Sequence, residues 1–289
     1  MNMPKLICLV GIPGAGKTAY ANNYIKAYGG VHLSSDGIRK ELYGDEAVQC
    51  NPHEVFSLMQ SRAVEALNDG RTVLYDATNI TRKDRASIIA ACPKFVRIEA
   101  HVIWASIETC IERDASRSRT VGKAVIDKML KRFQPPFYDE GFHDIKIIIP
   151  NSFDNAAYFH KVIDNMRIPH DNPHHTSRVL EHCKEAHVNA CLLGIDIELE
   201  RASLLHDIGK PYTKAFVDSK GNPCETAHYY SHHNVGAWMS YGMPNATPFI
   251  AWLIGVHMEP FFDSKYYNKL PPYLKSYVDH LHKCDLDAH

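Results

Sequence analysis

The sequence predicts two domains of different fold class, an α/β domain with a mostly parallel sheet followed by an all-helical domain. In the first half, short apolar and β-branched runs alternate with helical patterns, as expected for a parallel sheet with helices on both faces. After Pro150 the strand signal disappears and helical patterns continue to the C-terminus. Thirteen of the 18 histidines lie at or after His170, so the two halves are expected to perform different chemistry.

The element pattern gives the expected domain ranges: 1–150 for the α/β domain, 151–169 for a linker and 170–289 for the helical domain. Buried strands are predicted for residues 6–10, 31–34, 72–75, 96–103 and 146–149. Helices are predicted between them for residues 17–28, 53–68, 82–91, 106–113 and 123–133, and a connecting helix for 155–166. Further helices are expected to start at Asn172, Asp196 and Thr247, each of which suits an N-cap.

Composition limits the possible functions. The 289 residues carry a formal net charge of −1, so any contact with a polynucleotide must come from a local patch. The eight cysteines are scattered without a Cys-x-x-Cys pair, which favours reduced thiols in a cytoplasmic protein. The N-terminus lacks the layout of a signal peptide, and no apolar run approaches bilayer length, so no membrane partner is expected. The oligomeric state is left open.

Residues Gly11–Thr18, GIPGAGKT, form a phosphate-binding loop between a predicted strand and a predicted helix. Gly11, Gly14 and Gly16 allow backbone N–H groups to curl round phosphates at the helix N-terminus. Lys17 is expected to reach the β- and γ-phosphates of ATP, and the Thr18 hydroxyl to hold Mg²⁺. The first domain is therefore predicted to bind a nucleoside triphosphate and to transfer its terminal phosphate.

The phosphate acceptor is expected near the end of the second strand. Asp36 follows this strand directly and could take the proton from an attacking hydroxyl. Arg39, one helical turn later, could hold a phosphate of the acceptor through its planar guanidinium. The alternative is that Asp36 caps the next helix and Arg39 is a solvated side chain.

Positive charge is expected over the transferred phosphoryl group. The third strand ends in Asp76-Ala77-Thr78-Asn79, and two groups of arginines come after it. These are Arg82 and Arg85, and then Arg113, Arg117 and Arg119. Arg113 and Arg117 are four residues apart and share a helix face, so they are favoured over Arg119. The alternative for the second group is an exposed basic helix face.

These motifs resemble the polynucleotide 5′-kinase branch of the P-loop phosphotransferases over about residues 4–150. The resemblance implies that Asp36 is the general base for a 5′-hydroxyl, that Arg39 contacts a nucleic-acid phosphate and that Arg117 touches ATP. The phosphate loop is specific for nucleotide binding. The Asp36–Arg39 element is less specific, because kinases of small metabolites share the scaffold.

The second domain is predicted to hold a metal centre. His206 and Asp207 are adjacent at the end of a helical pattern, and such a pair can offer a nitrogen and a carboxylate to one metal. Helical spacing places further candidates on apolar helix faces: His175, His232, His257 and Asp285. Several buried histidines with two carboxylates are costly unless a cation compensates them.

The same residues resemble the HD superfamily of metal-dependent phosphohydrolases over about residues 170–289. The resemblance implies that His175, His206, Asp207 and Asp285 bind one metal. His232 and His257 occupy places where members with two metals supply further ligands. The expected cofactors are one or two divalent ions such as Mn²⁺, Ni²⁺, Co²⁺ or Fe²⁺, which would activate a water to attack phosphorus.

Several residues near these ligands are left open. His182, His233, His280 and His282 are favoured as surface or supporting histidines, and Asp287 is a weaker rival of Asp285. Lys210 is expected to hold a phosphate oxygen, with a solvated lysine at the helix end as the alternative.

Together, the two domains predict a bifunctional end-healing enzyme whose substrates are DNA or RNA ends. The first domain would phosphorylate a 5′-hydroxyl, and the second would remove a 3′-phosphate or open a 2′,3′-cyclic phosphate before a ligase acts downstream. The main alternative is a small-metabolite kinase fused to an HD nucleotide hydrolase, which the near-neutral charge favours slightly. A non-enzymatic alternative is an ATP-gated sensor whose HD module only binds.

Overall fold

The computed structural model describes residues 3–48, 50–172 and 177–288. The chain divides into two compact units. The first runs to Met129 and includes Pro136–Asn151, and the second comprises Leu130–Pro135 and the chain from Ser152 onward. Within the described ranges no helix is long and apolar enough to cross a membrane.

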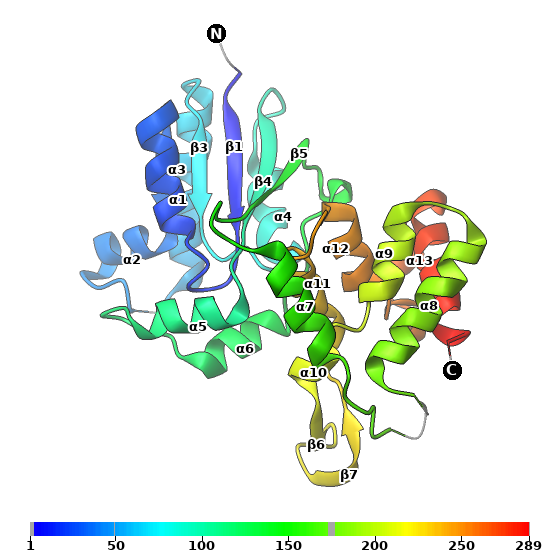
Figure 1. The fold of residues 1–289 in the computed structure, drawn as a ribbon. Helices are drawn as coiled ribbons and strands as arrows, with labels where there is room; N and C mark the ends of the chain where they lie inside the picture. Colours follow the sequence, from blue (N-terminus) through cyan, green and yellow to red (C-terminus); the bar gives the residue numbers. More distant parts are fainter. Residues whose placement is uncertain (1–2, 49, 173–176, 289) are drawn as a thin grey trace. The chain divides into compact units, whose positions relative to one another are not determined.

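The first unit is built round a five-stranded parallel sheet in the order β2-β3-β1-β4-β5 (Figure 1). Its strands are β1 (Lys5–Val10), β2 (Val31–Ser34), β3 (Val73–Asp76), β4 (Arg97–Ile103) and β5 (Asp144–Ile148). Leu6 to Val10 of the central strand are all fully buried, although successive side chains point to opposite faces. Both faces of the sheet are therefore covered, as the long apolar runs predicted.

The helices of the first unit connect parallel strands. They are α1 (Lys17–Tyr28), α2 (Ser35–Tyr43), α3 (Pro52–Asn68), α4 (Arg82–Ala91), α5 (Ile107–Ala115), α6 (Lys123–Leu130) and the 3₁₀ turn η1 (Tyr138–Glu140). On one face, Ala21 of α1 packs with Ile7, Leu9 and Leu74 in a continuous apolar cluster. The α/β prediction for this unit is confirmed.

The second unit is mainly helical. Its helices are α7 (Asn155–Asn165), α8 (Val179–Leu193), α9 (Ile197–Leu205), α10 (Lys210–Thr213), α11 (His232–Ser240), α12 (Pro248–Val256) and α13 (Pro272–Leu286). Two 3₁₀ turns, η2 (Pro260–Phe262) and η3 (Tyr267–Lys269), lie between α12 and α13. Asp196 and Thr247 cap their helices as predicted, through Leu199 N at 2.9 Å and Ile250 N at 3.1 Å.

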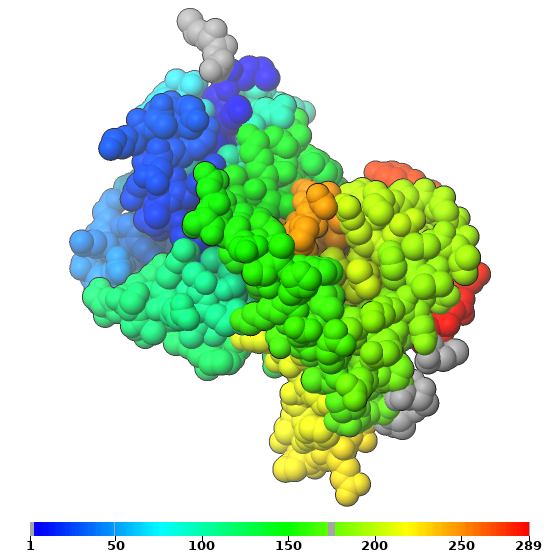
Figure 2. Space-filling view, in the orientation of Figure 1, coloured from blue at the N-terminus to red at the C-terminus, as the bar shows by residue number. Residues whose placement is uncertain are grey.

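Two features of this unit go beyond the predicted pattern. An antiparallel hairpin, β6 (Ala215–Val217) and β7 (Pro223–His228), interrupts the helices and projects from the unit, yellow in Figures 1 and 2. β6 has only three residues, and β7 contains Pro, Glu and His, so neither has the apolar alternation over about 4–8 residues that marks a strand in sequence. In addition, α7 matches the connecting helix predicted for 155–166, but its Tyr158 and Val162 are buried, so most of the range expected as a linker, 151–169, belongs to the second unit.

Candidate functional site

The phosphate loop connects β1 to α1 and is shaped by its glycines. Gly14 has a φ of +82°, and a Cβ at this position would lie 2.1 Å from the carbonyl oxygen of Cys110. Gly16, at φ +107°, precedes α1 and supplies no side-chain cap. The first N–H groups of α1 are thus available to an anion, as the predicted phosphate site requires.

Lys17 and Thr18 lie at the start of α1. The Lys17 ammonium folds back on the loop and donates to the carbonyl oxygens of Gly11 at 2.8 Å and Ile12 at 3.1 Å. Burial lowers the pKa of Lys17, and this effect is opposed by the negative charge of Asp76. A triphosphate in the loop would supply the negative charge that this buried ammonium needs.

Asp76, at the carboxyl end of β3, completes an oxygen-rich site beside the loop. Its Oδ2 accepts hydrogen bonds from Thr18 Oγ1 at 2.9 Å and contacts His32 Nε2 at 3.0 Å. A hydroxyl and a carboxylate in contact are the donors that Mg²⁺ uses beside nucleotide phosphates, so this pair fits the ion. The sequence placed Asp76 in a relevant segment but assigned it no role, although its position at a strand end was the available signal.

The structure separates the two explanations for Asp36 and Arg39. Ser34, not Asp36, caps α2, because its hydroxyl accepts from Gly37 N at 2.9 Å. Arg39 is only 9% exposed, so it is not a solvated side chain. Its Nη1 lies 2.7 Å from Asp36 Oδ1, while the Asp36 carboxylate remains largely open to solvent. The pair is therefore a fixed acid–guanidinium unit with an accessible carboxylate.

The predicted arginines fall into two groups. Arg113 Nη1 lies 3.4 Å from the carbonyl oxygens of Gly14 and Ala15, against the phosphate loop. Arg117 is exposed, and its charge helps to lower the pKa of Lys17, after burial as the main cause. Arg119 Nη1 lies 3.7 Å from Asp36. All three members of this second group thus lie near the loop or its candidate acceptor site.

Arg82 and Arg85, by contrast, are structural. Arg85 is fully buried and binds both oxygens of Glu140 at 2.7 Å. Arg82 pairs with Asp139, which precedes Glu140 on η1. The expectation that these two arginines approach the γ-phosphate is not met, because both guanidinium groups are held by carboxylates of their own unit.

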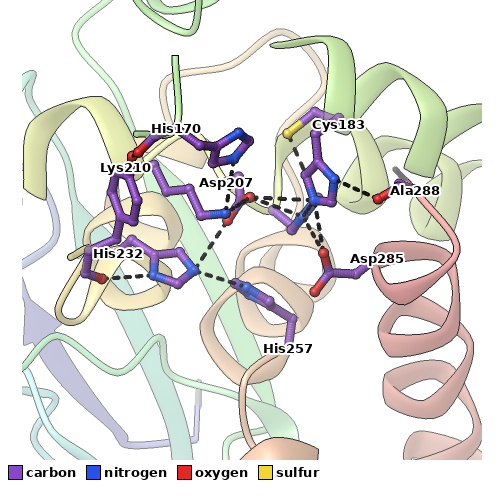
Figure 3. Close-up of polar contacts among 12 residues, drawn as sticks. His170, Cys183, Asp207, Lys210, His232, His257, Asp285 and Ala288 are labelled. Atoms are coloured by element: carbon purple, nitrogen blue, oxygen red, sulfur yellow. Dashed lines mark hydrogen bonds and ion pairs between the residues drawn. The ribbon is translucent and has the colours of Figure 1, made fainter. Parts of the chain in front are cut away.

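The histidine cluster of the second unit gathers side chains from α8, α11, α12, α13 and the turn after α9 (Figure 3). His206 Nε2 lies 3.3 Å from His182 Nε2 and 3.2 Å from Asp285 Oδ1. On the other side, His232 Nε2 lies 3.2 Å from His257 Nε2 and 3.2 Å from Asp207 Oδ1. Asp207 connects the two groups, since its Oδ2 lies 3.4 Å from His206 Nε2.

Hydrogen bonds to backbone carbonyls fix the tautomer of each histidine. Each Nδ1 lies 2.7–3.2 Å from a carbonyl oxygen. The partners of His182, His206, His232 and His257 are Ala288, Ser203, Tyr229 and Ile254, in that order. A carbonyl oxygen can only accept, so each Nδ1 carries a proton and Nε2 is the nitrogen left to bind a metal. This is the arrangement in which a second hydrogen bond orients a metal-binding histidine.

The facing Nε2 atoms provide a test of whether a metal fits. Two Nε2 atoms at 3.2–3.3 Å need a proton or a metal cation between them, because their lone pairs would otherwise repel each other. Two nitrogens bound at about 2.1 Å to one metal are separated by about 3.0–3.4 Å at bond angles of about 90–110°. The observed separations match this value in both pairs. The residues therefore fit two divalent cations, with Asp207 shared between them.

Charge and burial agree with this assignment. Burial lowers the pKa of His257 well below its usual value, so this ring stays neutral and able to bind a cation. Burial alone would raise the pKa of Asp207, but the charges of Lys210 and His206 hold it well below its usual range. Burial opposes ionisation of His206, but the charges of Asp207, Cys183 and Asp285 raise its pKa well above the usual value, so without a metal this ring holds a proton that a bound cation would displace.

The predicted ligands His206, Asp207, His232, His257 and Asp285 are brought together. His175 lies outside the described residues. His182, which was favoured as a supporting histidine, is instead fully buried and lies 2.9 Å from Asp285 Oδ1. Its place on the apolar face of its helix was the available signal.

Lys210 is also better defined than the sequence allowed. It is 6% exposed, and its Nζ lies 2.5 Å from Asp207 Oδ2 and 3.3 Å from His170 Nε2. It is therefore not a solvated lysine at a helix end. His170, itself buried, was not predicted to belong to the site.

The other open residues lie farther out. His233 lines the cavity beside the cluster, with its ring centroid 6.2 Å from that of His257. His282 packs against Phe261, and His280 faces Ser276. Asp287 is exposed at the end of α13.

Comparison with known proteins agrees with both sites. Residues 6–136 match the family model described as AAA domain, and residues 179–281 match the model described as HD domain. The chain joins a P-loop domain to an HD domain. The second match covers most of the histidine cluster, whose His and Asp groups could hold a metal ion.

Similar proteins extend beyond the length of this chain. Transcription factor bHLH140 of Arabidopsis thaliana is 24% identical over 171 residues, which cover 56% of this chain and 18% of that protein. The chain thus spans less than a fifth of that relative. A chain of the Pnkp1/Rnl/Hen1 RNA repair complex has a TM-score of 0.42 at 21% identity, covering 46% of this chain and 44% of that one. A fungal RNA kinase has a TM-score of 0.40 at 15% identity, and the match covers 58% of this chain and 45% of that one.

Proposed function

We propose that the chain heals polynucleotide ends: its P-loop domain phosphorylates 5′-hydroxyl ends, and its HD domain removes a 3′-phosphate or opens a 2′,3′-cyclic phosphate. The observation that carries the kinase half is the fixed Asp36–Arg39 pair near the phosphate loop. The observation that carries the hydrolase half is the set of four histidines whose Nε2 atoms face one another in pairs beside Asp207 and Asp285. The products, a 5′-phosphate and a hydroxyl at the other end, are the groups that a ligase joins.

In the kinase domain, the solvent-facing carboxylate of Asp36 would accept the proton of the 5′-hydroxyl. The bond from this oxygen to the γ-phosphorus forms while the bond to the β-phosphate oxygen breaks, and ADP leaves. Arg39 would fix Asp36 and bind an acceptor phosphate. Lys17, Arg113 and Arg117 would offset the negative charge on the transferred group.

In the HD domain, one ion would be held by His182, His206 and Asp285, and a second by His232 and His257, with Asp207 touching both. We propose Mn²⁺, Ni²⁺, Co²⁺ or Fe²⁺ for this mixed nitrogen and oxygen set. Divalent ions bound here would make a nucleophile from water near neutral pH. Lys210 would stabilise the negative charge on a phosphate oxygen, since its ammonium already lies beside Asp207.

One oligonucleotide carrying a 5′-hydroxyl and a 2′,3′-cyclic phosphate tests both halves. With ATP, Mg²⁺ and Mn²⁺, we expect mass spectrometry to record one added phosphate at the 5′ end and hydrolysis at the other end. Parallel reactions contain free nucleosides, mononucleotides and sugars. Phosphorylation of the small molecules without labelling of DNA or RNA would show that the first domain is a metabolite kinase and not a polynucleotide kinase. Bound metal without hydrolysis of any phosphoester would favour a sensor.

A further inference from the structure

A cavity of about 530 Å³ opens beside the metal centre of the HD domain. Asp207, His232, His257 and Asp285 line one part of it, so the cavity includes the candidate reaction centre. Another part of its wall is aromatic and consists of Tyr229, Tyr230, Phe261 and Phe262. A site that needed to admit only a phosphate group would require no aromatic wall of this kind.

Three of these rings are left unusually open to solvent. Phe262 is 66% exposed, Phe261 49% and Tyr230 39%. Exposed apolar side chains that cluster at one place mark a binding surface more often than rings scattered singly. Here the rings border the same cavity as the metal-binding residues, which makes them part of the substrate site and not a separate patch.

The rings are positioned by the same segments that carry the metal ligands. Phe261 and Phe262 lie on η2, four and five residues after His257. The Phe261 ring packs edge-on against His282 of α13, with the centroids 4.3 Å apart. Tyr230 is two residues before His232, and its ring stacks on His228 at 5.3 Å. Two short segments therefore deliver both the metal-binding nitrogens and the aromatic wall.

We propose that Tyr230, Phe261 and Phe262 form a stacking wall for the nucleobase next to the phosphate that the HD domain hydrolyses. A nucleobase is a flat aromatic group held a few ångströms from a ribose 2′- or 3′-phosphate, so it would reach the wall when the phosphate lies at the metals. The cavity volume is in the range that accommodates a small ligand. The substrate class is thus a phosphoester at a nucleoside, and this assignment rests on the proposed hydrolase function.

Stacking also predicts how selective the site is. Every base offers a π face, so an aromatic wall binds bases with little preference for their identity. An end-healing enzyme must accept any terminal base, and the wall suits that requirement. A phosphate lacking a base would still reach the metals but would lose the stacking contact.

The test compares two substrates that differ only in the base: a nucleoside 2′,3′-cyclic phosphate and a methyl riboside 2′,3′-cyclic phosphate. For the Mn²⁺-loaded full chain, we expect the base-free compound to have a KM at least about 5-fold higher, the smaller effect of losing one base–aromatic stack. Phe262→Ala should raise KM for the nucleoside substrate by a similar factor, with little change in kcat. It should leave the KM of the base-free substrate unchanged.

Tyr273→Ala is the matched control, because Tyr273 is 66% exposed, like Phe262, but does not line the cavity. It should change neither KM. Equal KM values for the two substrates in the unmodified chain would overturn the stacking proposal, and so would equal effects of Phe262→Ala on both. The rings would then serve another occupant, such as a protein partner.

Failure of the proposed hydrolase has a different outcome, namely no turnover of either substrate. Stacking is then measured directly with 2-aminopurine riboside 3′-phosphate, whose fluorescence is quenched when the base stacks. Quenching that weakens at least about 5-fold in affinity in Phe262→Ala but not in Tyr273→Ala would support the wall. Absence of quenching at any concentration up to millimolar would overturn it.

Discussion

Replacing Asp207 should separate the two activities. Its carboxylate lies between the two histidine pairs, with Oδ1 3.2 Å from His232 and Oδ2 3.4 Å from His206. Asp207→Ala removes the oxygen donor shared by both proposed metals. Because a metal contributes several kcal/mol to the transition state, we expect hydrolysis to fall by more than about 1,000-fold, which equals about 4 kcal/mol. Labelling of a 5′-hydroxyl oligonucleotide by the same preparation should remain.

The structure also indicates how Asp207→Ala should change the stability of the protein. Without the carboxylate, the buried ammonium of Lys210 loses its partner at 2.5 Å, and breaking such a pair costs about 3–5 kcal/mol. Thermal unfolding with and without Mn²⁺ measures this loss. Asp207→Asn keeps the side-chain volume and gives a second variant if Asp207→Ala folds poorly. Asp287→Ala, at an exposed position just after the end of α13, is the control. Retention of more than about a tenth of the hydrolysis in folded Asp207→Ala, or an equal loss in Asp287→Ala, would refute the reasoning.

Three further predictions concern the rest of the chain. In steady-state assays, Asp36→Asn should lower kcat for 5′-phosphorylation by about 10²–10⁴-fold and leave hydrolysis unchanged. The control Asp69→Asn, at the end of α3, should change neither activity. Arg85→Gln should lower the free energy of unfolding, measured in urea, by about 3–5 kcal/mol, because this guanidinium is buried in an ion pair. Its KM for ATP should stay within about 2-fold of the unmodified chain. A large KM effect in folded protein would contradict this prediction. Burial, followed by the charge of His232, lowers the pKa of His233 to about 3, so its contribution to stability is complete above its unfolded pKa of about 6.5 and is lost as pH falls from there toward 3. Without metal, His233→Gln should therefore lose less stability between pH 7 and pH 4.5 than the unmodified chain does. The control His160→Gln, at an exposed position on α7, should behave like the unmodified chain. Equal acid sensitivity of all three proteins in thermal melts would count against the lowered pKa of His233.

Residues with strong local patterns were predictable. The bounds of α1 and α4 agree with the predicted ranges because apolar spacing and Thr81, the cap of α4, define them locally. The hairpin β6–β7 was not predictable, because β6 has only three residues and β7 is mostly polar, so the strands are defined by their pairing with each other. Contacts between residues distant in sequence also decided which arginines serve the kinase site. Arg85 is held by Glu140, whereas Arg113 lies against the phosphate loop.

The metal centre shows the same division. The sequence by itself indicated that His232, His257 and Asp285 would face a helical core, because periodicity places them on apolar faces, and it marked His206 and Asp207 as an adjacent pair at a helix end. Only the tertiary structure decided that His182 joins them, since its partner Asp285 is 103 residues away. It also decided which ring nitrogens face one another, because backbone carbonyls accept the Nδ1 protons and leave the Nε2 atoms pointing into the cluster. Residue types and spacing specify which groups enter the core, whereas distances between helices specify which groups can share a cation.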